Sequence, residues 1–553
     1  MSKRPGRAPI ERRDFLRASA LAALATTVDV SLGESRPSRP LPAPPDSRSW
    51  QQSAFELEET TIAALQEGMR SGRDTARSIA ERYLARMDAI DKSGPAINAV
   101  IERNPDAIKI AEERDAERKA GRVRGPLHGI PVLIKDNIDT ADRMRTSAGS
   151  LALAESIAPR DAFIAARLRE AGAVILGKTN LSEWANFRST RSTSGWSGRG
   201  GQTKNPYVLD RNPCGSSSGT GASISANLAA VGIGTETDGS IVCPSSANGL
   251  VGIKRTVGLV SRSGIIPISH SQDTAGPMAR TVADAAELLA ALSGPDPRDP
   301  ATAASRGKAA ASYANVLNPA ALKGVRIGVA RSFFGFSAAV DRIMDEAIAA
   351  LKSAGAIIVD PANITTSGKF DDAEGEVLNF EFKADLNAYL AALGPSAPRK
   401  TLADLIAFND QNADREMPYF GQEQFLKAQA KGPLTSPAYK AAREKCLRMS
   451  RTEGIDATLT KHRVVAIVAP TGGPAWPTDL LNGDHFTGSS STPAAVSGYP
   501  SVTVPAGYVH GLPVGISFIG GQWSDGTLIG LAYAFEQATK VRRPPRFEPT
   551  VKL

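Results

Sequence analysis

Three short segments gather a lysine, serines and glycines in an order that could support nucleophilic chemistry. They are Gly129–Asp139 (GIPVLIKDNID), Asn212–Ser223 (NPCGSSSGTGAS) and Gly232–Pro244 (GIGTETDGSIVCP). A serine hydroxyl becomes a strong nucleophile when a neighbouring base takes its proton, and a neutral lysine can be that base. Glycine-rich turns can direct several backbone N–H groups at one point, as an oxyanion hole must.

Each segment also has a plainer interpretation when it is taken alone. Lys135 ends an apolar strand, so it is either a surface lysine or a base that burial keeps neutral. The segment around Ser216 could be a flexible Gly/Ser linker, but the apolar, helix-like run Ala222–Val231 that follows it favours a loop seated on a core. Thr, Asp and Gly crowd together just before Ser240, as in a turn that presents backbone N–H groups.

Two further motifs fit familiar patterns without the structural context that those patterns need. Gly172–Thr179 (GAVILGKT) fits the phosphate-loop pattern, but its four middle residues read as a buried strand and a helix precedes them, so we expect no nucleotide site. Gly215–Gly219 (GSSSG) fits the nucleophile elbow, but no strand leads into it. An elbow enzyme would also need a histidine, and His270, His462 or His485 could serve, so this alternative stays open.

The three segments together resemble the amidase signature family. That family has a lysine after a strand, a Gly-Ser-Ser loop and a G-T-[DE]-x-G-G-S turn, which stand here as Lys135, Gly215-Ser216-Ser217 and Gly234–Ser240. The resemblance runs from about Glu58 to Phe547 and is greatest to bacterial peptide amidases. Further segments that carry it are Gly252-Ile253-Lys254, Asp273–Arg280, Ala403–Asn409, Gly421-Gln422-Glu423, Ala469–Pro477 and Gly498–Pro505.

The resemblance implies a serine hydrolase that opens amide bonds through a Ser-Ser-Lys triad and an acyl-enzyme. It assigns Ser240 as nucleophile, Ser216 as proton bridge and Lys135 as base, with a cis peptide bond between Gly215 and Ser216. It places the oxyanion hole at the backbone N–H groups of Thr237, Asp238, Gly239 and Ser240. It implies no metal and no cofactor. The implied fold is a single large α/β domain with a central mixed sheet flanked by helices on both faces.

Two positions depart from the common pattern of the family. Asp238 stands where a second glycine is usual, and Val242 stands where an arginine often follows the nucleophile. Both departures resemble the peptide amidase branch, and the missing arginine removes an anchor for a free carboxylate. We therefore expect a small-molecule or peptide amide substrate, with ammonia released from C-terminally amidated peptides. The alternatives are hydrolysis of aryl, fatty or cyclic oligo-amides, a subunit of an amidotransferase complex, and a non-catalytic periplasmic binding protein on the same fold.

Short apolar runs alternate with helical patterns, and this alternation predicts the elements that must position the candidate residues. The expected strands are Ile130–Ile134, Ala173–Leu176, Val231–Gly234, Val325–Val329, Val464–Val468, Ser501–Val504 and Val514–Ile519. The expected helices include Thr61–Gly68, Thr75–Ile90, Pro105–Ala120, Asp161–Gly172 and Leu402–Phe408. The pattern predicts one α/β unit over residues 55–547, with the polar stretch 370–460 as a helical insertion near the substrate cleft.

The N-terminus reads as an export signal. The sequence ERRDFLR places the twin arginines Arg12 and Arg13 before a short apolar run, Ala18–Val28. We expect residues 1–30 to be a twin-arginine signal peptide, residues 31–54 to be a proline-rich linker, and the mature protein to be periplasmic. The apolar run is too short to span a membrane, so we expect no stable membrane insertion. An ordinary amphipathic helix is the alternative.

Composition argues against several other functions. The net charge is +8 over 553 residues, but much of it lies in the first 25 residues and no long Lys/Arg run follows, so we expect no nucleic-acid partner. The five histidines lack metal-ligand spacing, and three cysteines make no disulfide framework. Cys214 and Cys243 flank the candidate site, and we expect both to be small buried hydrophobic residues rather than a disulfide.

Overall fold

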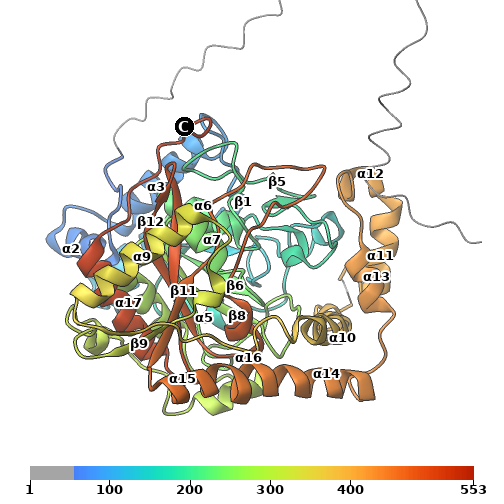
Figure 1. The fold of residues 1–553 in the computed structure, drawn as a ribbon. Coiled ribbons are helices and arrows are strands. Elements are labelled where there is room, and N and C mark those ends of the chain that lie inside the picture. Colours follow the sequence, from blue (N-terminus) through green and yellow to red (C-terminus); the bar gives the residue numbers. More distant parts are fainter. Residues whose placement is uncertain (1–54, 396, 553) are drawn as a thin grey trace, which may run out of the picture. The chain divides into compact units, whose positions relative to one another are not determined.

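The computed structural model describes residues 55–395 and 397–552, in which a sheet of eleven strands runs in the order β1-β3-β2-β6-β8-β7-β12-β13-β11-β9-β10 (Figure 1). The pairs β2–β3, β2–β6, β9–β10 and β9–β11 are parallel and the other pairs are antiparallel, so the sheet is mixed, as the family resemblance implied. Its strands are β1 Val100–Arg103, β2 Pro131–Lys135, β3 Val174–Thr179, β6 Val231–Glu236, β7 Val251–Lys254, β8 Thr274–Ala279, β9 Arg326–Val329, β10 Ile357–Val359, β11 Ala466–Pro470, β12 Ser501–Val509 and β13 Leu512–Ile519. A separate two-stranded sheet pairs β4 Trp196–Ser197 with β5 Gly201–Gln202.

The strands that position the candidate residues are buried at every position. β2 (PVLIK), β3 (VILGKT) and β6 (VGIGTE) lie beside one another, and strands covered on both faces are expected to read as continuous apolar runs. Because β2 is parallel to both of its neighbours, the carboxyl ends of the three strands lie at the same edge. Lys135 ends β2 and Glu236 ends β6, so the sheet itself delivers both residues to that edge.

Threonine N-caps begin several of the surrounding helices. The side chains of Thr61, Thr75, Thr281 and Thr401 each accept a hydrogen bond from a backbone N–H in the first turn of α2, α3, α8 and α11. The described helices are α2 Ile62–Ser71, α3 Ala76–Ile90, α4 Ala107–Lys119, α5 Phe163–Glu170, α6 Ser218–Ser225, α7 Val242–Ala247, α8 Val282–Leu292, α9 Ala338–Ser353, α10 Asp371–Ala392, α11 Leu402–Gln411, α12 Ala413–Glu416, α13 Glu423–Gln429, α14 Pro437–Leu447, α15 Asp456–His462, α16 Thr492–Ser497 and α17 Asp525–Thr539. None of them is long and apolar enough to cross a membrane.

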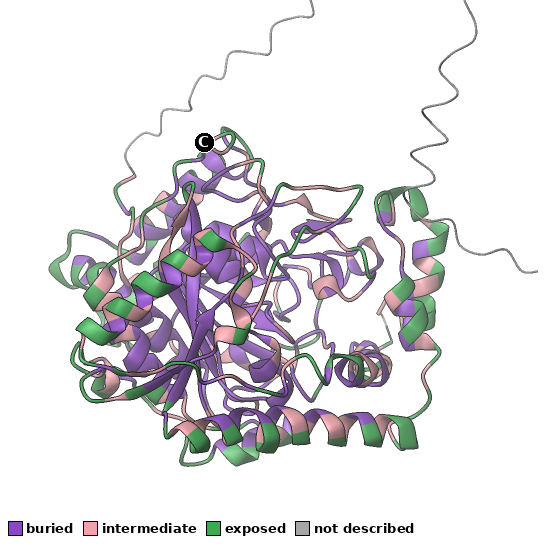
Figure 2. Cartoon of the chain, viewed as in Figure 1, coloured by how far each residue is buried: buried purple, intermediate pink, exposed green. Residues whose placement is uncertain are grey.

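Helices cover both faces of the sheet, as expected. Successive residues of a strand point to opposite faces. Along β12, Val502 joins the main apolar core together with Phe535 of α17. The next residue, Thr503, lies against Gly515 together with Ser246 of α7, on the other face. As a result, the strands are buried along most of their length and the exposed residues gather on the outer sides of the helices (Figure 2).

Residues 370–460 contain α10 to α14 and a π-helical turn, Arg448–Ile455. In Figure 1, α10 to α13 group to one side of the sheet, and α14 leads back beneath it towards α15. Phe382 of α10 and Phe425 of α13 form a second apolar core with Trp184 of the main body. The helices of this segment are therefore packed directly on the loop that contains Trp184.

Two groups of elements differ from the sequence-based expectation. The seven expected strands are present, but four more belong to the sheet, namely β1, β7, β8 and β10. The expected helical run Ala222–Val231 was wrong in position, because α6 covers Ser218–Ser225 and the chain turns at Asn227, which has a φ of 60°, before β6 begins. The serines and glycines of α6 are all buried, so tertiary packing overrides their low helix propensity.

Candidate active site

Lys135 is fixed at the carboxyl end of β2 with its ammonium group entirely inside the protein. Its Nζ donates to Ser216 Oγ at 2.7 Å, to Thr235 Oγ1 at 2.9 Å and to the Thr235 carbonyl at 3.3 Å. Burial lowers the pKa of Lys135 from 10.5 to about 7, although the carboxylates of Asp273 and Glu236 oppose that change. A large share of the side chain is therefore neutral near pH 7 and able to accept a proton from Ser216.

Ser216 lies in the tight loop that leads into α6. The Gly215–Ser216 peptide bond is cis, as expected from the family resemblance. The Ser216 side chain is fully buried, and its carbonyl accepts the backbone N–H of Ser182 at 3.0 Å. The neighbouring Ser217 donates its hydroxyl to the Thr235 carbonyl at 3.0 Å, which ties the loop to the end of β6. The loop is thus held so that the Ser216 hydroxyl meets Lys135.

Ser240 lies in the turn that joins β6 to α7. Glu236, the last residue of β6, accepts the backbone N–H groups of Ile241 at 2.7 Å and Val242 at 3.0 Å, so its carboxylate caps α7 directly after Ser240. Gly239 has a φ of 76°, in the left-handed region that glycine adopts without a steric cost. Thr237 donates its hydroxyl to Asp273 at 2.7 Å, which fixes the start of the turn.

The backbone N–H groups of this turn are available to a ligand. Within the described part of the chain, the N–H groups of Thr237, Asp238, Gly239 and Ser240 donate to no protein acceptor. Buried backbone donors are rarely left unpaired, so four in succession beside a cavity are free to bind an external acceptor. This is the arrangement that an oxyanion hole requires.

The turn and Ser240 open onto a cavity of about 380 Å³. Lys135 and Ser216 do not line the cavity and are fully buried, whereas Ser240 is 9% exposed. The Ser217 N–H donates to the Ser240 carbonyl at 3.3 Å, so the two loops are in contact, but no hydrogen bond joins the hydroxyls of Ser216 and Ser240 among the described residues. The large apolar residues of the lining are Phe187, Ile268, Leu378, Trp476 and Phe486, and the polar part includes Asn186, Ser194, Asp238, Asp484, Ser489, Ser491 and Thr492.

The sequence model of the amidase family matches residues 78–529 of this chain. This chain belongs to the amidase family. The native peptide amidase of Stenotrophomonas maltophilia is 52% identical in sequence, with a TM-score of 0.85 and coverage of 89% of this chain and 99% of that one. A peptide amidase solved in complex with the competitive inhibitor chymostatin is 53% identical, with a TM-score of 0.87 and coverage of 89% and 100%. A probable amidase of Arabidopsis thaliana is 44% identical over 504 residues, which is 90% of this chain and 93% of that protein. The chain is therefore an amide hydrolase with the α/β fold of the peptide amidase structures.

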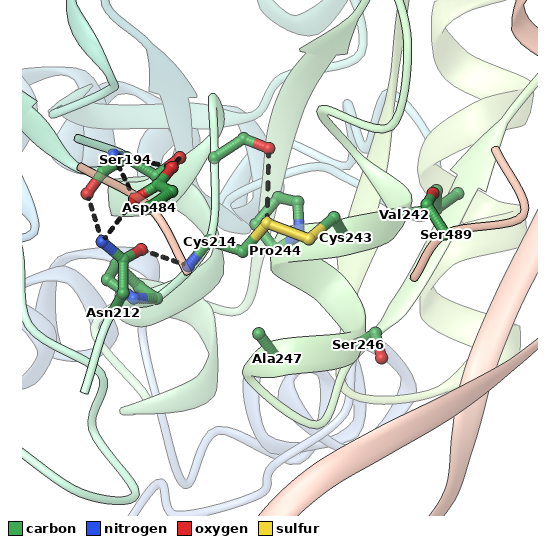
Figure 3. The surroundings of a disulfide bond; sticks show 12 residues. Ser194, Asn212, Cys214, Val242, Cys243, Pro244, Ser246, Ala247, Asp484 and Ser489 are labelled. Atoms are coloured by element: carbon green, nitrogen blue, oxygen red, sulfur yellow. Dashed lines mark hydrogen bonds between the residues drawn. A yellow bond between two sulfur atoms is a disulfide. The ribbon is translucent and has the colours of Figure 1, made fainter. Parts of the chain in front are cut away.

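The amidase contains a disulfide between Cys214 and Cys243, and our expectation of two unpaired cysteines was wrong (Figure 3). Cys214 immediately precedes the cis Gly215–Ser216 bond, and Cys243 lies in the first turn of α7, just after Ser240. Their Cα atoms are 6.1 Å apart, within the range that a disulfide spans. The bond covalently joins the loop of Ser216 to the helix that follows Ser240. Cys446 is a free, buried cysteine of α14.

Sequence reasoning missed Asn186, which lines the cavity of the amidase. Trp184, Ala185 and Asn186 have φ values of 50°, 53° and 69°, so three successive residues with side chains occupy the left-handed region. That conformation is costly outside glycine and tends to occur at functional sites. Asn186 Nδ2 donates to Ser194 Oγ at 3.1 Å, while its Oδ1 is buried and has no partner among the described residues. Nothing in the sequence pattern indicates such a turn.

The segments that fit the phosphate-loop and nucleophile-elbow patterns have structural roles in the amidase. The strand expected at Gly172–Thr179 is present as β3, and Lys178 is fully buried, where its Nζ donates to the Ile138 carbonyl at 2.6 Å and to Thr146 Oγ1 at 3.0 Å. In the GSSSG motif, Ser217 is also fully buried and hydrogen-bonded to Thr235. No strand leads into it, so the elbow alternative lacks the geometry that it needs.

One further cluster of titratable groups lies near the amidase site. Among the described residues, His270, Glu381 and Asp385 have the spacing of possible metal ligands. Both oxygens of Glu381 already accept hydrogen bonds, from Ser271 and Tyr439 among others. The cluster fastens α10 to the loop before β8 and lies outside the lining of the cavity.

Proposed function

We propose that this amidase releases ammonia from C-terminal peptide amides through a Ser240–Ser216–Lys135 triad. The observation that carries the proposal is the buried hydrogen bond of 2.7 Å between Lys135 Nζ and Ser216 Oγ, next to Gly215 in the lining of the cavity onto which Ser240 opens. A buried lysine with a pKa near 7 in contact with a hydroxyl supports a role as a base.

In the proposed mechanism, neutral Lys135 accepts the proton of Ser216 while Ser216 accepts that of Ser240. The Ser240 oxygen attacks the amide carbon, and the backbone N–H groups of residues 237–240 bind the resulting oxyanion. Ser216 then gives a proton to the leaving nitrogen and regains one from Lys135. The carbon–nitrogen bond breaks, ammonia leaves, and a water molecule hydrolyses the acyl-enzyme by the same relay in reverse order.

The packing around Ser216 supports a small leaving group. The leaving nitrogen must approach Ser216 to be protonated, and that side chain is fully buried. A Cβ added at Gly215, which lines the cavity, would come within 2.2 Å of Ser182 Oγ and 2.9 Å of Ser194 Oγ, so the loop is packed tightly against these two serines. The unpartnered Oδ1 of Asn186 supplies an acceptor for an N–H of the primary amide. This packing supports ammonia as the leaving group rather than a further amino-acid residue.

The size and apolar lining of the cavity support an extended acyl group. Leu378 of α10 and the loop residues Trp476 and Phe486 give it an apolar lining, and Phe486 packs edge-on against Trp476. The cavity of about 380 Å³ exceeds what a simple aliphatic amide fills and is comparable to a short peptide amide. The name of the peptide amidase relatives agrees with this substrate class.

A direct test incubates the purified protein with a short peptide amide, its free acid and a homologue that is one residue longer at the carboxyl end. Mass spectrometry and ammonia measurement should show conversion of the amide to the acid, with internal peptide bonds left intact. Internal cleavage, or turnover of aryl or fatty amides alone, would contradict the proposed substrate class.

We also propose that the protein is exported to the periplasm. The twin arginines Arg12 and Arg13 lie outside the described residues, and the proposal rests on their sequence context. The Cys214–Cys243 disulfide supports it independently, because such bonds persist in oxidising compartments. Residues 1–50 fused to a reporter that must fold before export should deliver it to the periplasm, and replacement of both arginines by lysine should stop delivery. Unchanged delivery of the lysine variant would contradict the twin-arginine route.

A further inference from the structure

Asp238 is a carboxylate inside the oxyanion turn, and the mechanism above uses only its backbone. Its side chain is half-buried and lines the cavity beside Ser240. Oδ1 accepts the Ser491 hydroxyl and Oδ2 accepts the Thr492 hydroxyl at 2.7 Å. A carboxylate has about four lone-pair sites, so these two bonds leave one site on each oxygen.

The position of this carboxylate is fixed from two sides. Ser491 packs on the oxyanion turn, because a Cβ added at Gly239 would meet Ser491 Oγ at 3.1 Å. Thr492 begins α16, so both hydroxyl donors belong to a structured part of the chain. Burial raises the pKa of Asp238, and the hydrogen bonds from Ser491 and Thr492 oppose that rise. The remaining acceptor sites therefore belong to a side chain that is held in place in the cavity.

The substrate atom that can reach these acceptor sites follows from the proposed binding of the carbonyl. The backbone N–H of Asp238 holds the substrate's carbonyl oxygen, so the carboxylate of the same residue is close to the atoms next to that carbonyl. In an amino-acid amide, the nitrogen on the α carbon is two covalent bonds from the carbonyl carbon. The apolar lining residues Phe187, Ile268 and Leu378 offer that nitrogen no acceptor.

The other carboxylate that lines the cavity does not compete for this role. Asp484 accepts from the Ser194 N–H at 3.0 Å, the Ser194 hydroxyl at 2.6 Å and Asn212 Nδ2 at 3.3 Å (Figure 3). It also accepts from Trp476 Nε1 at 3.2 Å. These protein donors occupy its acceptor sites. Asp484 thus holds the loop around Trp476 and serves as a matched control for Asp238.

We infer that Asp238 is a specificity-determining residue that accepts a hydrogen bond from an N–H on the α carbon of the scissile amide. This inference rests on the proposed function and deepens it, because it explains how amides of amino acids and peptides are preferred over amides without nitrogen at that position. A site built to accept such an N–H discriminates against an analogue that lacks it, since the carboxylate is then left unpaired.

The experiment compares kcat/KM for N-acetylphenylalaninamide and 3-phenylpropanamide, which share the carboxamide and the ring and differ in the α nitrogen. We expect the wild type to prefer the first by roughly 10- to 100-fold, the range for a hydrogen bond to a charged group. Asp238→Ala should lower this ratio at least about tenfold, and Asp484→Asn should preserve it. Because damage to the oxyanion turn slows both substrates alike, it cancels in the ratio.

Two further substrates make the test independent of the variants. N-acetyl-N-methylphenylalaninamide lacks the N–H and should be as poor a substrate of the wild type as 3-phenylpropanamide. Phenylalaninamide carries an ammonium in place of the peptide N–H and so tests which of the two groups is the donor. A rate of hydrolysis that depends on Asp238 with either donor supports the inference. A ratio that Asp238→Ala leaves unchanged, or rapid turnover of the N-methyl compound, would overturn it. Ammonia release from none of the four compounds would instead contradict the proposed function.

Discussion

The activity of this amidase should follow the protonation of Lys135. With an ordinary pKa of 10.5, the neutral share of a lysine at pH 7 is only about 0.03%. The lowered pKa of about 7 raises that share to about one half, a gain of roughly a thousandfold in the form that can accept a proton. Below pH 7 the neutral share falls about tenfold with each pH unit, and above pH 8 it is nearly complete.

The assay is kcat/KM for a peptide amide between pH 5.5 and 9.5. We expect a rising limb with a slope of about one below pH 7 and a plateau above pH 8. Lys135→Met should lose roughly a thousandfold or more in kcat, with a much smaller change in substrate binding. The lysine mechanism would be refuted if the residual activity of the Lys135→Met variant still rose with pH along the same limb and one histidine substitution removed that limb.

The same burial should make Lys135 costly for the fold. Its pKa is lower in the folded chain than in the unfolded chain, so between about pH 7 and 10.5 the unfolded state binds more protons. Stability of the wild type should therefore rise with pH through this window, and the cost is fully present below pH 7. Lys135→Met removes the group, so its denaturation midpoint at pH 6.5 should exceed that of the wild type. A lower midpoint would contradict a lowered pKa of Lys135 in the folded protein.

Three other predictions follow from the site. Ser240→Ala should abolish ammonia release. Ser245→Ala is the control, because it removes a buried hydroxyl that has no hydrogen-bond partner among the described residues, and it should retain ammonia release. Equal loss of activity in both variants would argue for a folding defect instead. Replacing Cys214 and Cys243 together by serine should lower the free energy of unfolding by about 3–4 kcal/mol, the loop-closure value for a separation of 29 residues, and an unchanged denaturation midpoint under non-reducing conditions would contradict the disulfide. Asn186→Leu should slow hydrolysis of a peptide amide more than that of the matching methyl ester, because the ester's leaving oxygen has no N–H to bind; equal slowing would remove Asn186 from leaving-group recognition.

The strands near the site were predictable because their apolar runs are a local signal. β2, β3 and β6 are buried on both faces, so they appear in the sequence as uninterrupted apolar segments. The missed strands lack that signal. β1 and β10 are short strands at the two edges of the sheet, and β8 contains Gly276 and Pro277, which are uncommon inside strands.

The site was predictable only as far as its residues lie in motifs. Lys135, Ser216 and Ser240 stand in segments whose order resembles a family, so their identities could be stated before their distances. The Cys214–Cys243 bond depends on how two loops approach one another, and no rule of spacing indicates that distance. Asn186 likewise gains its place from three successive left-handed residues, a conformation that composition does not predict.

The central claim is that Ser240 carries the acyl group between the two halves of the reaction. Rapid acid quench during turnover of a peptide amide, followed by peptide mass spectrometry, tests it most directly. We expect the mass of the acyl group on the hydroxyl of Ser240 in the wild type and its absence in Ser240→Ala. An acyl group on Ser217, or product formation with no acylated serine at any quench time, would contradict the account.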